Sequence, residues 1–306
     1  MTQRILLCTL ALALTIGGYA GAVDAQPVPR DPVPLEPANV PSVLRYQQMG
    51  RGEPVILIQG ANLPMRMWDA QVRVLSSEFQ VVRYDVRGFG GSGPRDSVPY
   101  QSHSDLRALL DHLGIERAHL VGLSLGGRIA VDFALTYPER VRSLVLADPG
   151  LSGYMWDTTA AQEWSGPIVD AMRKGDFLKA ADLWLKSGFM APAMENQELA
   201  PRLTQLARTN ARVYEEYRDL EVPLSPPALD RLADIRAPTL LLLGERDVPD
   251  EHRIVERLHR EVPGSESVVF PRVGHVVNLE APEEFNRVVL AFLRKHSVGT
   301  HAATPR

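Results

Sequence analysis

Residues 119–127 read His-Leu-Val-Gly-Leu-Ser-Leu-Gly-Gly and carry the strongest structural signal in the chain. The apolar run before Gly122 predicts a strand, and the apolar spacing after Gly126 predicts a helix. A serine at the tight turn between them adopts a strained backbone, which requires small residues two positions before and after it. Ser124 is therefore a candidate nucleophile at a helix N-terminus. Such a serine is otherwise a helix cap, so the choice depends on finding a base and an acid.

Strand and helix signals alternate on both sides of this segment. Continuous apolar runs predict buried parallel strands, and apolar residues spaced three or four apart predict helices between them. This rhythm predicts an α/β fold with a mostly parallel, doubly wound sheet. The expected strands are 43–49, 55–58, 81–84, 118–121, 141–147, 239–243 and 267–270, and the expected helices include 67–77, a helix beginning near 102, 250–261 and 282–295.

The rhythm stops between residues 151 and 227, where only helical stretches occur, at 160–173, 177–189 and 199–220. We expect this segment to be a helical cap inserted into an α/β core of residues 42–150 and 228–297. Trp156 and Trp184 are candidates for an apolar substrate pocket above Ser124. The simpler alternative is that the cap aromatics only attach the cap to the core.

The first 41 residues have a different character. Arg4, the apolar run 5–16 and the small residues up to Ala25 are typical of a secretory signal peptide at 1–25, because the run is too short to span a bilayer. The six prolines of residues 26–41 predict an extended linker, and 298–306 reads as a disordered tail. The expected location is the periplasm or the exterior, with no stable membrane insertion after cleavage.

Composition narrows the function classes. The 306 residues carry a net charge of −4 with scattered basic residues, which argues against a nucleic-acid partner. The single cysteine, Cys8, lies in the segment expected to be removed, so neither a disulfide nor a thiol nucleophile is expected. No metal site or cofactor is predicted. The expected partner is a small-molecule substrate, and the oligomeric state is not encoded in any recognisable pattern.

In an open parallel sheet the chemistry gathers at the carboxyl ends of the strands. Of the eight histidines, only His275 lies in a loop just after a late strand, and it is the predicted general base. Asp247 follows the apolar run 239–243 and is the predicted acid, with Asp148, at the end of the preceding strand, as the alternative. The backbone N–H groups of Leu125 and Ala61 are the predicted oxyanion donors.

Two further features have structural interpretations. Asn62 follows the oxyanion turn and is a third candidate for the pocket. The segment 85–92 is rich in glycine, but its spacing does not fit a dinucleotide loop, so we interpret it as a turn in which Arg87 bonds neighbouring loops.

Several motifs resemble the α/β-hydrolase superfamily over most of the chain, about 43–296. They are LIQGANL (57–63), YDVRGFGGS (84–92), VGLSLGG (121–127), PERVRSLVLAD (138–148), PTLLLLGERD (238–247) and GHVVNLEAPEEF (274–285). The oxyanion loop with MWDAQ (67–71) is similar to the serine-nucleophile branch that includes 3-oxoadipate enol-lactonases and related esterases. Many relatives have His-Gly where this chain has Gln59 and Gly60. Dehalogenases and epoxide hydrolases of similar outline use an aspartate at the position of Ser124, so the resemblance argues against those reactions.

The resemblance and the residues together imply a serine hydrolase acting on an ester or lactone of a small to medium, partly apolar substrate through an acyl-enzyme. The same triad would also serve a C–C bond hydrolase, a cofactor-free perhydrolase or an aminopeptidase. A catalytically silent binding protein on a hydrolase scaffold is the alternative from another class. Arg66 and Arg128 are candidates to bind a substrate carboxylate, although each is more simply an ion-pair arginine.

Overall fold

The computed structural model describes residues 43–94, 98–215 and 220–298. The predicted signal peptide and linker, and nearly all of the predicted tail, lie outside these residues. Within them, no helix is long and apolar enough to cross a membrane.

Seven strands form one sheet in the order β1-β3-β2-β4-β5-β6-β7. Only β1 is antiparallel, to β3; every other neighbouring pair is parallel. The mostly parallel, doubly wound fold class is therefore confirmed. The strands are β1 (Tyr46–Met49), β2 (Pro54–Ile58), β3 (Gln80–Tyr84), β4 (Ala118–Leu123), β5 (Val141–Ala147), β6 (Thr239–Gly244) and β7 (Glu266–Phe270).

Helices cover both faces of the sheet. The chain passes from β2 to β3 in one direction along the sheet and from β3 through β4 to β5 in the other, so right-handed crossovers place their helices on opposite faces. On one face α3 (Asp69–Leu75), preceded by the short η1 (Met65–Trp68), packs against α12 (Pro282–Lys295). On the other face α4 (Ser102–His112) packs against α5 (Leu125–Thr136), and α10 (Pro249–Glu261) packs against β6.

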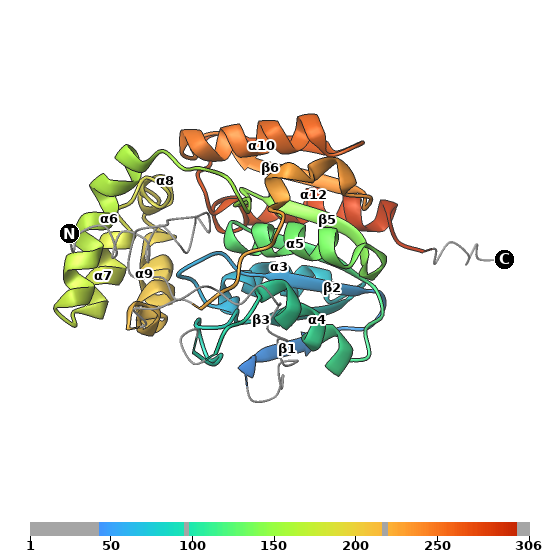
Figure 1. The fold of residues 1–306 in the computed structure, drawn as a ribbon, viewed down its shortest axis with the longest axis horizontal. Coiled ribbons are helices and arrows are strands. Elements are labelled where there is room, and N and C mark those ends of the chain that lie inside the picture. Colours follow the sequence, from blue (N-terminus) through green and yellow to red (C-terminus); the bar gives the residue numbers. More distant parts are fainter. Residues whose placement is uncertain (1–42, 95–97, 216–219, 299–306) are drawn as a thin grey trace, which may run out of the picture.

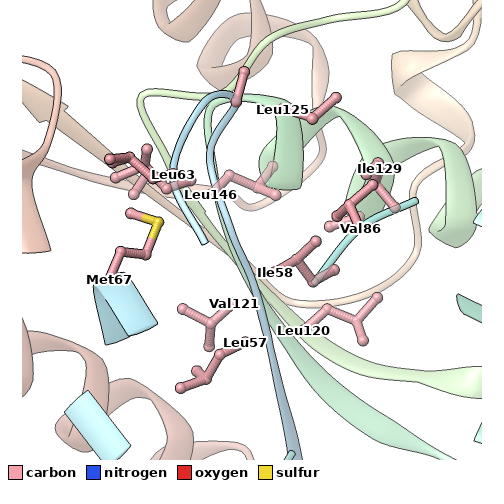
Figure 2. Close-up of a cluster of buried hydrophobic side chains, with 14 of the residues drawn as sticks. Leu57, Ile58, Leu63, Met67, Val86, Leu120, Val121, Leu125, Ile129 and Leu146 are labelled. Atoms are coloured by element: carbon pink, nitrogen blue, oxygen red, sulfur yellow. The ribbon is translucent and has the colours of Figure 1, made fainter. Parts of the chain in front are cut away.

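Alternating side chains of the central strands fill the two halves of the core. Figure 2 shows Leu57 and Val121 pointing towards Met67 on one side of the sheet. It shows Ile58 and Leu120 pointing towards Ile129 on the other side. All of these side chains are fully buried. Burial on both faces explains why β2 and β4 are uninterrupted apolar runs in sequence.

The inserted segment forms α6 (Thr158–Arg173), α7 (Phe177–Trp184), α8 (Ala191–Met194) and α9 (Ala200–Thr209). Figure 1 shows these helices together at the left of the view, beside one end of the sheet. The predicted helix 199–220 is too long: α9 ends at Thr209, and a short 3-10 turn, Ala211–Tyr214, follows. Asn210 directly follows α9, and its side-chain oxygen accepts the N–H of Gly90 in the core, at 2.6 Å.

Three other boundaries differ from the sequence prediction. The first strand begins at Tyr46 rather than 43, and the predicted helix 177–189 ends at Trp184. The predicted helix 67–77 is divided into η1 and α3. After β7, the short α11 (Val277–Glu280) precedes α12 and was not expected as a separate element.

Candidate active site

Ser124 occupies the predicted turn between β4 and α5. Its φ of 53° and ψ of −113° place it in a strained region for a residue with a side chain. The turn has no room for larger neighbours: a Cβ at Gly122 would collide with the carbonyl group of Gly126, and one at Gly126 would collide with the carbonyl oxygen of Ile58. The Ser124 N–H donates to Ala147 O at 2.9 Å, so β5 helps to hold the turn. The two glycines therefore allow the strained serine to form.

His275 and Asp247 are hydrogen-bonded to each other, with 2.7 Å between Nδ1 and Oδ2. Asp247 follows β6, and its other oxygen accepts the N–H of Val248 at 2.7 Å. His275 lies in the loop after β7, with its ring packed edge-on against Phe189 of the cap at 4.8 Å between centroids. Because Asp247 occupies Nδ1, Nε2 is the ring nitrogen left to accept a proton.

Ser124 and His275 line the same cavity, which we name the Ser124 cavity. Its free space is about 330 Å³, part of which is open to solvent. The Ser124 Oγ is buried and has no hydrogen-bond partner within the described protein, so it is free to turn towards a base. The lining residues are Gly60, Ala61, Asn62, Leu63, Leu123, Ser124, Trp184, Phe189, Met190, His275 and Val276.

The two predicted oxyanion donors flank the serine. Leu125 is the first residue of α5, where backbone N–H groups have no partner within the helix. Ala61 lines the cavity, and the preceding Gly60 has no room for a side chain beside Leu123. Together these N–H groups and the α5 N-terminus form a site suited to a developing negative charge.

The three pocket candidates have different positions. Asn62, in a left-handed conformation with φ of 62°, and Trp184 both line the cavity. Trp156 is not among the lining residues; its ring packs edge-on against Phe189 at 5.8 Å, behind the cavity wall. Phe189 and Met190 line the cavity without having been singled out in sequence. Their apolar character indicated that they could line a pocket. The sequence pattern did not show which of the apolar cap residues face the core.

The two candidate arginines both form ion pairs outside the cavity lining. The Arg66 side chain is largely exposed and contacts Asp69. Arg128 is buried, with its guanidinium 2.8 Å from Glu221 and 3.5 Å from Asp132. Neither is placed to hold a substrate carboxylate in the Ser124 cavity.

The segment 85–92 has a structural role. Arg87 makes a bidentate ion pair with Asp105 of α4, at 2.8 and 2.7 Å, and its guanidinium lies over the ring of Tyr100 in the loop before α4, 4.7 Å from the centroid. Its partners are therefore a helix as well as a neighbouring loop. Asp85 accepts the N–H groups of Met65 and Gly91. These bonds tie the loop after β3 to η1, next to the oxyanion turn.

Gln59 is fully buried, and its side-chain amide has no hydrogen-bond partner within the described protein. It immediately precedes Gly60 and Ala61 of the predicted oxyanion turn. The predicted donor is the backbone N–H of Ala61, which does not require a histidine at position 59.

The alpha/beta hydrolase family profile matches residues 55–288, which is most of the chain. The chain belongs to the alpha/beta hydrolase family. The resemblance inferred from the motifs is thus confirmed, and the hydrolase has the sheet expected of that family.

Relatives of the hydrolase differ in their reactions. The 2-hydroxy-6-oxononadienedioate/2-hydroxy-6-oxononatrienedioate hydrolase of Burkholderia vietnamiensis (strain G4 / LMG 22486) is 32% identical over 266 residues, covering 82% of this chain and 91% of that protein. A thermophilic esterase from Thermogutta terrifontis is 28% identical with a TM-score of 0.65, covering 83% of this chain and 94% of that one. The enol-lactonase from Burkholderia xenovorans LB400 shares the fold, with a TM-score of 0.65 at 24% identity over 82% and 96% of the two chains.

Proposed function

We propose that the protein is a serine hydrolase that cleaves a carboxylic ester or lactone of a small, neutral, partly apolar substrate. The observation that carries this proposal is the Ser124 cavity itself. It brings Ser124 together with a histidine already bonded to an aspartate, and its lining in the described part of the chain contains neither lysine nor arginine. A neutral acyl group fits such a wall, because an unpaired carboxylate would lose its hydration there.

The reaction follows from the geometry. Ser124 Oγ attacks the carbonyl carbon while His275 Nε2 accepts its proton. The Ala61 and Leu125 N–H groups stabilise the oxyanion, and Asp247 stabilises the imidazolium. His275 then returns the proton to the leaving alcohol, which leaves an acyl group on Ser124. Water, activated by the same imidazole, releases the acid and restores the serine.

C–C bond hydrolysis is the second candidate, supported by the 32% identical dioate hydrolase. The substrate in that protein's name carries two carboxyl groups. Among the described residues, the side chains lining the Ser124 cavity include no lysine or arginine to pair with either carboxyl group, which favours the ester or lactone reaction here.

A substrate panel distinguishes the two reactions. Purified protein would be assayed with p-nitrophenyl acetate, butyrate and octanoate, with simple lactones, and with a vinylogous 1,5-diketone acid, each alongside Ser124→Ala. We expect turnover of the short esters or lactones that is lost in Ser124→Ala. Turnover of the diketone acid without any ester or lactone would overturn the proposal in favour of C–C hydrolysis.

We also propose that the mature protein is exported, on the strength of residues 1–25. The test is to fractionate producing cells and to determine the N-terminus of the purified protein. Export predicts a cleaved chain beginning near Gln26 in the periplasm or medium. A chain in the cytoplasm that retains residue 1 would overturn this proposal.

A further inference from the structure

A second buried carboxyl group lies beside the one that holds His275. Asp148 follows β5, and Asp247 follows β6. Because these parallel strands are neighbours, their carboxyl ends bring the two side chains together. One side-chain oxygen of each aspartate and one ring nitrogen of His275 all lie within 4.8 Å of one another. The sequence suggested Asp148 as an alternative to Asp247, whereas the structure places both at the histidine.

The two aspartates have unequal sets of hydrogen-bond donors. Asp247 accepts the Val248 N–H on one oxygen and contacts the His275 ring on the other. Asp148 accepts only the Gly244 N–H, at 2.8 Å, on Oδ1. Its Oδ2 is buried and has no partner within the described protein, and the residue is 0% exposed. The environment therefore stabilises a negative charge on Asp247 more than on Asp148.

Two carboxylates this close in a buried site do not both remain ionised, since their repulsion adds to the cost of burial. Burial and the neighbouring Asp247 raise the pKa of Asp148 well above its ordinary value. Asp148 is also approached by Glu251 of α10, whose own pKa is raised well above its ordinary value by burial. The neighbouring charged groups also include Glu280 of α11, which interacts with Asp247 and His275.

We propose that Asp148 is a positioning residue that remains a neutral acid, donates its proton in a hydrogen bond to Asp247, and holds that carboxylate against His275. The inference rests on the proposed function of the triad. The proton stays on Asp148 throughout the reaction, so Asp247 keeps the single negative charge that stabilises the imidazolium. Asp148 itself touches neither the substrate nor Ser124 Oγ in this scheme.

The decisive variant is Asp148→Asn. Asparagine reproduces the neutral acid, because its oxygen accepts the Gly244 N–H while its NH₂ donates to Asp247. It also tolerates the left-handed backbone at this position, where φ is 41°. We expect kcat within about 3-fold of wild type. Asp148→Ala removes the donor, and kcat should fall about 10- to 100-fold with little change in KM, since a misplaced base slows the chemical step.

The pH profile of kcat/KM separates this role from a merely structural one. Asp148→Asn changes no charge if Asp148 is neutral, so the acid limb of the profile should stay in place. If Asp148 were an anion, removing it would take a negative charge from beside the imidazole and move the acid limb down by about one pH unit or more. That shift would overturn the proposal, as would a loss of kcat in Asp148→Asn as large as in Asp247→Asn.

Infrared spectroscopy gives a readout that does not depend on activity. The difference spectrum between wild type and Asp148→Asn at neutral pH should contain the carbonyl stretch of a protonated carboxyl group, and a carboxylate band in its place would overturn the proposal. Asp182→Asn is the matched control, because Asp182 lies in the cap and is paired with Arg208 at 2.7 Å; its difference spectrum should contain a carboxylate band, and its kcat should stay near wild type. A wild type without hydrolytic activity would refute the proposed function, while the infrared result would still report the state of Asp148.

Discussion

The core and the cap contribute to the Ser124 cavity in different ways. The core supplies Ser124, His275 and Asp247 from the carboxyl ends of parallel strands, where hydrogen bonds and backbone collisions leave little freedom. The cap supplies Trp184 and Phe189, whose apolar side chains line the cavity and take no part in the proposed reaction. We therefore expect the sheet to determine the reaction and the inserted cap to determine the choice of substrate.

Polar side-chain contacts help to attach the cap to the core, whereas the two halves of the core are filled by apolar side chains. Polar contacts link the cap and the core: Arg202 to Asp69 at 2.6 Å, Tyr154 to Asp250 at 2.7 Å, and the buried pair of Arg128 and Glu221. The partly exposed pair of Arg202 and Asp69 is of a kind that is individually weak, whereas breaking the buried pair would leave an unpaired buried charge. Changes in the core should affect activity and folding strongly, whereas changes in the cap away from that buried pair should mainly alter specificity.

The largest expected effect is the loss of either reacting group in the core. Ser124→Ala and His275→Ala should each reduce kcat for a short p-nitrophenyl ester by about 10⁴- to 10⁶-fold, because the two act as a unit. Circular dichroism and thermal melting should show a folded protein in both cases. Near wild-type turnover by either folded variant would refute the role assigned to that residue.

Next in size is the effect of one methyl group at the turn that holds the serine. Gly126→Ala should lower the free energy of unfolding by more than about 3 kcal/mol, since the new Cβ meets the backbone of β2. The matched change in the cap is Gly175→Ala, where no atom lies within 4 Å and φ is 71°. It should cost only about 1 kcal/mol. Urea titrations of the two variants measure how much unfolding free energy each one loses. Equal losses in the two variants would contradict the expected difference.

The pH dependence of stability tests the burial of a histidine in the core. Burial lowers the pKa of His103, in α4, to about 4. The unfolded chain therefore binds this proton more readily than the folded one, and stability is lost as pH falls from about 6.5 towards 4. The loss attributable to His103 should reach about 3 kcal/mol at most. Urea titrations at pH 7 and pH 4.5 should show a smaller drop in His103→Gln, and an unchanged drop would contradict the assignment.

The smallest expected effect comes from the cap wall of the cavity. Trp184→Ala should leave labelling of Ser124 by a fluorophosphonate unchanged while opening space beside the acyl group. The ratio of kcat/KM for octanoate over acetate esters should rise about 10-fold, the size of effect typical of a resized apolar pocket. The rate ratio across the ester series is the measurement, with Trp156→Ala as a control behind the wall. A uniform loss across all esters in Trp184→Ala would mean that the cap positions the triad instead.

The site residues of the core could be predicted from sequence more fully than those of the cap. Ser124, Asp247 and His275 could be singled out as candidates because tight turns at strand ends impose strong requirements on residue type, such as the glycines at 122 and 126. Trp156 and Phe189 could not be ranked, since the orientation of a cap helix depends on long-range packing that leaves no periodic trace. The end of α9 was also missed, and Asn210, which directly follows it, bonds to Gly90, 120 residues earlier in the chain.

The role of Asp148 could be predicted only in part from the sequence. Sequence order identified it as an acid at a strand end but presented it and Asp247 as alternatives. Only the pairing of β5 with β6 and the unequal donors around the two carboxyl groups assign them different states.

The most direct test of the central claim is to map covalent labelling by a fluorophosphonate probe with peptide mass spectrometry. We expect one label per chain, on the peptide that carries Ser124. The label should form rapidly in wild type and should be absent in Ser124→Ala. Asp247→Asn should slow the labelling strongly, because His275 then loses the carboxylate that orients it. A folded wild-type protein that is not labelled, or is labelled at another residue, would contradict the assignment of Ser124 as the nucleophile.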